Sequence, residues 1–463
     1  MDKTWELIRD HLELEAREGI AHYRSADDLL TEIDLSIGEA GIDDEALFEN
    51  LGEVMKRSPR TGSNRFFNQL FGGRDAPAVA GDLLATILNN SMYTYKAAGV
   101  HALIERELID RMCRFVGFEN GEGVFAPGGS MSNLQAMIVA RNEVIENSID
   151  DGFDGRRACV YVSEEGHYSI NKMAQFVGIG HNNVRAVPVD ERGRMRTDAL
   201  REMMDSDVKA GITPLMVVIT AGTTVLGAYD PIVETVEIAK EHGAWVHIDG
   251  AYGGSIILSK THRDHLLGCE LVDSITWDAH KMMGVPLVSS VILVREKGLL
   301  WRNFNENASY LFQEDTDELN FGTRSLQCGR RNDCLKLWAA WKRHGDAGYE
   351  QKVDHLIELA RSFADLVEAD EELTLTKNPE SMNVCFEVTG KGSAAICEML
   401  RKEDRLMLGW GVVEGRRVIR LPFVNSEITM DDVRMILDEI KAVASRLGAQ
   451  DNAIEAPLQP ACC

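Results

Sequence analysis

Three short segments carry residue types that could do chemistry together. The first, Ala126–Asn133, contains two glycines and two serines where an apolar strand-like run gives way to a helical pattern. Small residues let backbone N–H groups approach an anion, and the positive end of a helix dipole favours a phosphate there. A tight turn that caps a helix would look the same. Neither the dinucleotide nor the nucleoside triphosphate glycine pattern is present.

The other two segments place an ionisable side chain at the end of an apolar run. Asp249 follows 245–248, and Lys281 follows shortly after 274–277. Open α/β sheets bind their ligands at the carboxyl ends of the strands. A lysine that loses its hydration can form a Schiff base with a carbonyl compound. Taken singly, an Asp in a turn and a snorkelling surface Lys are the structural alternatives.

Together, a phosphate site, a strand-end Asp and a strand-end Lys suit one cofactor, pyridoxal 5'-phosphate. The interval between Asp249 and Lys281 is long enough for one crossover, so both can reach one pocket. The Lys would bind the cofactor's aldehyde, and the Asp would keep its pyridine nitrogen protonated. His167 follows another apolar run, 159–162, and could stack on the ring, although a single His more often has a structural role.

The elements that must position these residues alternate between strand and helix patterns. Strands are expected at 124–125, 159–162, 215–220, 245–248, 274–277 and 289–294, and helices at 134–145, 169–176 and 232–242. This alternation predicts βαβ units and an α/β fold with a mainly parallel sheet. Beyond about residue 345, a smaller α+β unit is expected, with helices at 353–367, 393–401 and 431–447 and strands at 383–388 and 418–424.

Domain boundaries follow from these changes of pattern. Residues 4–19 and 26–58 read as helical, so 1–60 is expected to form an N-terminal helical segment. A large cofactor-binding domain is expected at 61–345, a small domain at 346–448 and a flexible tail at 449–463.

Composition excludes several classes of protein. The 463 residues include 49 Lys and Arg against 74 Asp and Glu, a net charge of −25, which disfavours nucleic acid and anionic membranes as partners. No apolar run approaches the length of a membrane span, and the first residues do not resemble a signal peptide. Nine irregularly spaced cysteines, with no CxxC pair, predict reduced thiols in a cytoplasm and no metal site. The terminal Cys462 and Cys463 lack a C-a-a-X lipidation pattern.

From about residue 64 to 447 the sequence resembles the fold-type I, group II pyridoxal phosphate-dependent decarboxylases. Within that family it is nearest to the cysteine sulfinate decarboxylase-like members of the acidic amino acid branch. The segments that carry the resemblance are 65–70, 125–133, 220–224, 247–254, 277–284, 310–313 and 327–330. The resemblance implies an aspartate aminotransferase-like fold and a homodimer with shared active sites, in which the N-terminal helices pack on the partner subunit.

The resemblance also assigns site residues. The catalytic set is Lys281, Asp249 and His167, with Ala251 packing on the ring face opposite His167. Further cofactor contacts are implied for Gly129, Ser130, Ser132, Thr220 and His280. Substrate contacts are implied for Gln69, Phe71, Ser91, Tyr93 and Arg420.

Three of these positions bear on the substrate. The combination of Phe71, Ser91 and Tyr93 resembles the cysteine sulfinate and aspartate decarboxylases, and a bulky Phe71 would shorten the pocket by about one methylene. Arg420 would bind the second acid group through its two-pronged guanidinium, with an ordinary ion pair as the structural alternative. The expected reactions are cysteine sulfinate to hypotaurine and aspartate to β-alanine, with glutamate decarboxylation as the alternative.

One departure from the family pattern opens a further alternative. The family's mobile loop carries a Tyr that protonates the α-carbon after CO2 has left, whereas 314–321 contains none. Either another group such as His167 or Tyr310 substitutes, or the chain is an aldehyde-forming or transaminating enzyme. A silent cofactor-binding protein is disfavoured, because Lys281, Asp249, His167 and Arg420 are all present.

Overall fold

A computed structural model describes residues 2–17, 19–20, 23–306, 308, 310–312 and 317–450. The tail expected from 449 thus lies almost wholly outside the described residues, as do 314–316 of the loop without Tyr. The chain divides into two compact units. One comprises Arg74–Glu358 and Pro379–Met382, and the other comprises the chain up to Gly73, Leu359–Asn378 and the chain from Asn383.

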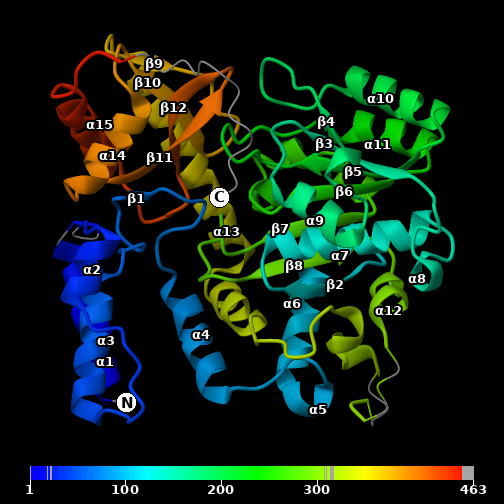
Figure 1. Cartoon of the computed structure of the whole chain (residues 1–463), viewed down its shortest axis with the longest axis horizontal. Coiled ribbons are helices and arrows are strands. Elements are labelled where there is room, and N and C mark those ends of the chain that lie inside the picture. Colours follow the sequence, from blue (N-terminus) through cyan, green and yellow to red (C-terminus); the bar gives the residue numbers. More distant parts are fainter. Residues whose placement is uncertain are drawn as a thin grey trace. The chain divides into compact units, whose positions relative to one another are not determined.

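The unit around Arg74–Glu358 contains a seven-stranded sheet (Figure 1). In spatial order its strands are β2 (Glu122–Ala126), β8 (Ser290–Val294), β7 (Ser274–Asp278), β6 (Trp245–Gly250), β5 (Thr213–Thr220), β3 (Ala158–Ser163) and β4 (Val184–Val187). Only β8 runs antiparallel to its neighbours. The prediction of an α/β fold with a mainly parallel sheet is confirmed. The sequence pattern missed β4, because this short strand is only partly buried and lacks a continuous apolar run.

Helices connect and cover these strands. The unit contains α4 (Ala76–Leu88), α5 (Tyr95–Ala98), α6 (Val100–Val116), α7 (Gly129–Val144), α8 (Ser148–Asp151), α9 (Ser169–Val177), α10 (Thr197–Lys209), α11 (Ile232–Glu241) and α12 (Leu299–Phe304). Short 3₁₀ turns lie at His181–Asn183, Gly253–Leu258, Arg263–Leu266, Cys269–Leu271, Asp317–Leu319 and Phe321–Arg324. Helix α7 contacts β5, β6, β7 and β8, and it also packs against α9. Helix α10 was not predicted, since only three of its side chains are buried and its sequence is largely polar. A longer helix, α13 (Cys334–Glu368), loses helical geometry at Gly345.

The topology brings the carboxyl ends of six strands to one edge of the large sheet. Strands β3, β4, β5, β6 and β7 are parallel, and β2 runs the same way as β7 because both are antiparallel to β8. Their carboxyl ends therefore meet at a single edge. Residues that follow these strands, including the start of α7, are placed where α/β proteins bind ligands.

The other unit contains a five-stranded sheet. Its order is β1 (Phe66–Phe67), β11 (Met407–Val413), β12 (Arg416–Pro422), β10 (Asn383–Val388) and β9 (Leu373–Leu375). Strand β1 is parallel to β11 and the remaining pairs are antiparallel. Helices α14 (Ser393–Lys402) and α15 (Met430–Ala444) complete the expected α+β arrangement. Strand β11 escaped prediction because Gly409 and Gly411 interrupt its apolar pattern.

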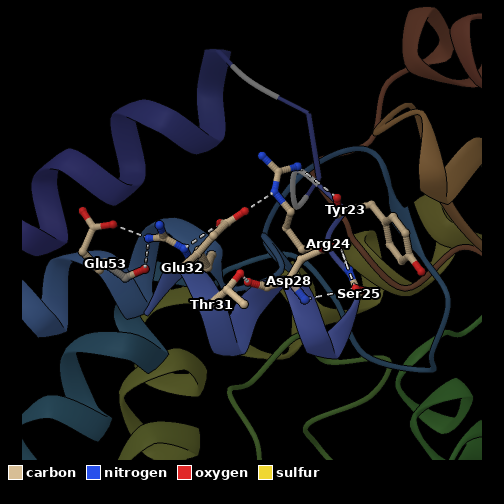
Figure 2. Close-up of polar contacts among 8 residues, drawn as sticks. Tyr23, Arg24, Ser25, Asp28, Thr31, Glu32 and Glu53 are labelled. Carbon is tan, nitrogen blue, oxygen red and sulfur yellow. Dashed lines mark hydrogen bonds and ion pairs between the residues drawn. The ribbon is translucent and has the colours of Figure 1, made fainter. Parts of the chain in front are cut away.

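The same unit holds α1 (Asp2–Arg17), α2 (Ala26–Glu32) and α3 (Asp44–Arg57). The helical reading of 26–58 is wrong between Glu32 and Asp44, where the chain leaves the helix. Ser25 and Asp28 cap α2 reciprocally, and Figure 2 shows Arg24 reaching Glu32, with Nε–Oε1 at 2.8 Å. No side chain of α2 is fully buried, and polar contacts hold its first turn. Among the described helices, none is long and apolar enough to cross a membrane.

Candidate active site

Asp249, the penultimate residue of β6, is held by hydrogen bonds from two directions. Asn133 Nδ2, on α7, donates to Asp249 Oδ2 at 2.9 Å, and the backbone N–H of Ala251 donates to Oδ1 at 3.2 Å. Asn133 Oδ1 accepts from the Thr276 hydroxyl at 2.8 Å, which fixes the amide's orientation. A buried polar group without such donors would be costly, and these two bonds fix the direction of the Asp249 side chain.

His247 extends this network into the sheet. Its Nε2–H donates to Asn133 Oδ1 at 3.0 Å, and its Nδ1 accepts from the Ser274 hydroxyl at 2.9 Å. Complete burial lowers the pKa of His247 to about 4, although the charge of Asp249 opposes that shift. His247 is therefore a neutral support for Asn133. His247 and Asn133 both lie in segments that carry the family resemblance, but the sequence analysis assigned neither a role.

Lys281 follows β7 and keeps its amine partly accessible. The Lys281 Nζ lies 3.6 Å from Asp278 Oδ2, and the lysine side chain is 21% exposed. Asp278 is the last residue of β7 and is almost fully buried. The partial exposure of this side chain leaves its amine accessible to a ligand that carries a carbonyl group.

Two histidines at this edge are neutral. Burial lowers the pKa of His167, partly opposed by the charge of Asp249, and burial likewise lowers the pKa of His280 against the charge of Asp278. His167 Nδ1 accepts from the Ser169 N–H at 3.3 Å, which leaves the proton on Nε2. A neutral, flat imidazole is suited to stacking on an aromatic ring.

The glycine-rich segment forms the start of α7. Gly128 has φ of 103°, a conformation that favours glycine. A Cβ on Gly129 would lie 2.6 Å from Asp278 Oδ2, so only glycine fits there. The Ser130 side chain is half-buried in the first turn, whereas the Ser132 hydroxyl is fully buried and lies 2.8 Å from Ser290 Oγ.

Three buried polar atoms at this edge lack a hydrogen-bond partner among the described residues. These atoms are Thr220 Oγ1, Asp278 Oδ1 and Ser289 Oγ. Buried polar groups are normally paired, so three such atoms at one sheet edge indicate a site that a polar ligand completes. With the Gly128 turn, the helix start and the Lys281 amine, these residues fit pyridoxal 5'-phosphate.

Ser91 and Tyr93 flank a residue that is held by a buried ion pair. Arg330 donates to Met92 O at 2.6 Å, to Glu105 Oε1 at 2.5 Å and to Phe125 O at 3.2 Å. The Met92 N–H donates back to Arg330 O at 2.9 Å. Arg330 therefore joins the segment around Met92 to the end of β2, just before the start of α7. Arg330 lies in segment 327–330, which carries the family resemblance, but the sequence analysis assigned it no role.

The remaining expected substrate residues lie in the other unit. Arg420 is on β12, and its guanidinium donates to Asn68 O, next to Gln69. Gly409 lies opposite on β11, where a Cβ would be 3.4 Å from the Arg420 Nη2. The Phe71 ring lies 5.6 Å from that of Phe66. This unit therefore brings Arg420 close to the Gln69 segment.

Comparison with known proteins identifies related sequences. The family described as the pyridoxal-dependent decarboxylase conserved domain matches residues 27–389. Human cysteine sulfinic acid decarboxylase is 36% identical over 92% of this chain and 92% of its own length. The bovine acidic amino acid decarboxylase GADL1 is 35% identical over 94% of this chain and 88% of its own length.

Solved structures show the same fold. Mouse CSAD in its apo form superimposes with a TM-score of 0.92 at 34% identity, covering 96% of this chain and 98% of that one. An Oryza sativa TDC structure with PLP and tryptamine gives a TM-score of 0.89 at 26% identity, with 96% of each chain covered.

Proposed function

Since this chain belongs to the pyridoxal-dependent decarboxylase family, we propose that it removes the α-carboxyl group of a small acidic L-amino acid, with cysteine sulfinate and aspartate preferred. It is a pyridoxal 5'-phosphate-dependent amino acid decarboxylase. One observation carries the assignment of the site: Lys281 and the Asn133-bound Asp249 lie at the same sheet edge as the glycine-rich start of α7.

The chain's residues divide the work among them. Bound pyridoxal phosphate supplies a ring that accepts electrons from the substrate's α-carbon. Lys281 would bind the cofactor through its amine, and Asp249 would hold a proton at the pyridine nitrogen. Neutral His167 would stack on the ring, and Ala251 would pack on its other face. Gly129, Ser130 and His280 would hold the phosphate, and Ser132 and Thr220 would support the site from α7 and β5.

Substrate choice rests on Arg420 and three pocket residues. Arg420 binds the second acid group, Gln69 assists it, and Phe71, Ser91 and Tyr93 set the length of the pocket. We expect kcat/KM for cysteine sulfinate and aspartate to exceed that for glutamate by about 10- to 200-fold, the usual effect of one methylene. Assays of CO2 release with these acids, cysteate and 2,4-diaminobutyrate test this expectation. A preference for glutamate would contradict the proposed pocket.

A matched pair of variants sharpens the test. Phe71→Ala should bring the kcat/KM values for aspartate and glutamate closer together, because it lengthens the pocket. Phe176→Ala removes a ring that is 67% exposed on α9, and it should leave the ratio unchanged. Equal ratios in both variants would remove Phe71 from the specificity argument.

The lack of Tyr in 314–321 favours a second candidate, an aldehyde-forming enzyme. Tyr310 remains nearby in the sequence and is 75% exposed. The same reactions separate the two candidates, because a decarboxylase releases one amine for each CO2. Aldehyde in place of amine, or a loss of activity that fresh cofactor restores, would favour the second candidate.

We also propose that the chain acts as a homodimer. Helix α4 presents a row of exposed apolar side chains, with Leu84 at 57%, Ile87 at 66% and Leu88 at 53% exposure. Contiguous apolar exposure of this kind marks protein interfaces. Light scattering should give twice the chain mass of 51.4 kDa, and Ile87→Glu should shift the protein toward monomer. A wild-type monomer at micromolar concentration would contradict the proposal.

A further inference from the structure

Asp278 is a buried carboxylate whose hydrogen bonding is incomplete. It is 1% exposed, and its Oδ1 has no hydrogen-bond partner among the described residues. Its Oδ2 lies 3.5 Å from His280 Nε2 and 3.6 Å from Lys281 Nζ. Such a group is expensive to bury unless a ligand or a proton completes it.

The unpartnered carboxylate lies against the start of α7. A Cβ on Gly129 would be 2.6 Å from Asp278 Oδ2 and 3.1 Å from Oδ1. The first N–H groups of a helix attract anions, and this helix start is also the proposed position of the cofactor's phosphate. A carboxylate and a phosphate would therefore compete for the same positive end.

The charges around Asp278 do not resolve that competition. From its own segment, Lys281 and His280 face it, and His167 interacts with it electrostatically from the turn after β3. Burial lowers the pKa of both histidines, so they contribute little positive charge at neutral pH. Asp249, on neighbouring β6, adds a further negative charge, and Asp278 pairs in register with the uncharged Ser290 of β8. The buried Lys336 also interacts with His280, but its ammonium group is paired with Asp82 and Asp333. Lys281 therefore has to balance both Asp278 and a phosphate dianion, and its single charge is too small to do so.

We propose that Asp278 takes up a proton from solvent when pyridoxal phosphate binds and then donates a hydrogen bond to a phosphate oxygen. A protonated carboxyl is a donor, and a carboxyl beside another anion tends to retain its proton. Cofactor affinity should consequently fall as the pH rises. This inference rests on the proposed cofactor site but is independent of the substrate.

Asp278→Asn tests the inference, because an amide keeps the shape, removes the charge and can donate to phosphate. Both apo proteins would be titrated with pyridoxal phosphate, and separately with pyridoxal, with tryptophan fluorescence as the readout. From about pH 6.5 to 8.5, the wild-type Kd for pyridoxal phosphate should rise relative to that of Asp278→Asn by up to about tenfold per pH unit. Pyridoxal, which lacks the phosphate, should show no such divergence.

Asp273→Asn is the matched control, because Asp273 immediately precedes the opposite end of β7 and accepts from the Val246 N–H. Its Kd ratio to wild type should not depend on pH. If the Kd of wild type and that of Asp278→Asn for pyridoxal phosphate changed with pH in parallel, the inference would be overturned. It would also be overturned if the two proteins diverged equally with pyridoxal, because the effect would then lie at Lys281. Weaker binding of both ligands at every pH by Asp278→Asn would also overturn it. Loss of the lysine-linked absorbance band is measured separately on Lys281 variants, so a misplaced cofactor site would be recognised independently.

Discussion

Lys281→Ala should lose the visible absorbance of the lysine-linked cofactor, and its kcat for decarboxylation should fall by about 10³-fold or more. The amine at this position is the proposed attachment point, and it lies 3.6 Å from Asp278 Oδ2. Alanine removes both the bond to the cofactor and any proton transfer by the amine. Absorbance spectra of the reconstituted protein and initial rates of CO2 release measure the two losses.

Two further variants separate the bond from the charge. Lys281→Arg retains a cation beside Asp278 but cannot form the same link, so it should fold normally and still lose the band. Lys172→Ala removes an exposed lysine that lies 4.7 Å from the Tyr168 ring, and it should keep both band and activity. Borohydride reduction of the wild type should fix the cofactor on the peptide that contains Lys281. Recovery of the label on another lysine would reject the assignment.

The sequence was sufficient to predict the residues that follow the strands. Asp249 and Lys281 each come after a short strand-like run rich in apolar residues, and the carboxyl ends of parallel strands share one edge of a sheet. The spacing of apolar residues and the order of strand and helix patterns along the chain were therefore enough to predict the fold class. The pattern failed for β4, β11 and α10, where partial burial or glycine removes the apolar signal.

The supporting residues could not be predicted in the same way. Asn133 is 116 positions from Asp249, and Arg330 is 225 positions from Glu105, so their pairing depends on tertiary structure. Their only sequence signal was a polar side chain inside an otherwise apolar or motif-bearing segment. Asp278 lies in segment 277–284, which carries the family resemblance. Its incomplete hydrogen bonding and its closeness to the start of α7 are visible only in the three-dimensional structure.

The net charge of −25 should oppose the binding of anions at this site. The cofactor phosphate and the proposed substrate are both anions that must enter an acidic protein. Surface carboxylates are screened by salt beyond about 8–10 Å, whereas groups inside a low-dielectric site are screened much less. Groups close to the bound anion therefore count for more than the net charge. At the edge of the large sheet these groups are the start of α7 and Lys281, opposed by the carboxylates of Asp278 and Asp249.

The buried pair of Arg330 and Glu105 should control stability more than any surface pair. Arg330 is 3% exposed and Glu105 is 1% exposed. Arg330→Met leaves the Glu105 carboxylate buried without its cation and leaves Met92 O and Phe125 O without a donor. The free energy of unfolding should fall by about 3–5 kcal/mol, the usual cost of breaking a buried pair. Urea unfolding followed by tryptophan fluorescence measures it.

A double variant shows whether the loss comes from the unpaired charge. Arg330→Met with Glu105→Leu removes both ions and should recover part of the stability, because an apolar replacement of a buried pair is often tolerated. Recovery should be incomplete, since the Phe125 N–H then loses its acceptor in Glu105 and each unmet buried group costs about 1–3 kcal/mol. Arg201→Met, which breaks an exposed ion pair with Glu241, should cost at most about 1 kcal/mol. Equal losses for Arg330→Met and Arg201→Met would show that the buried pair does not hold the segment between Ser91 and Tyr93.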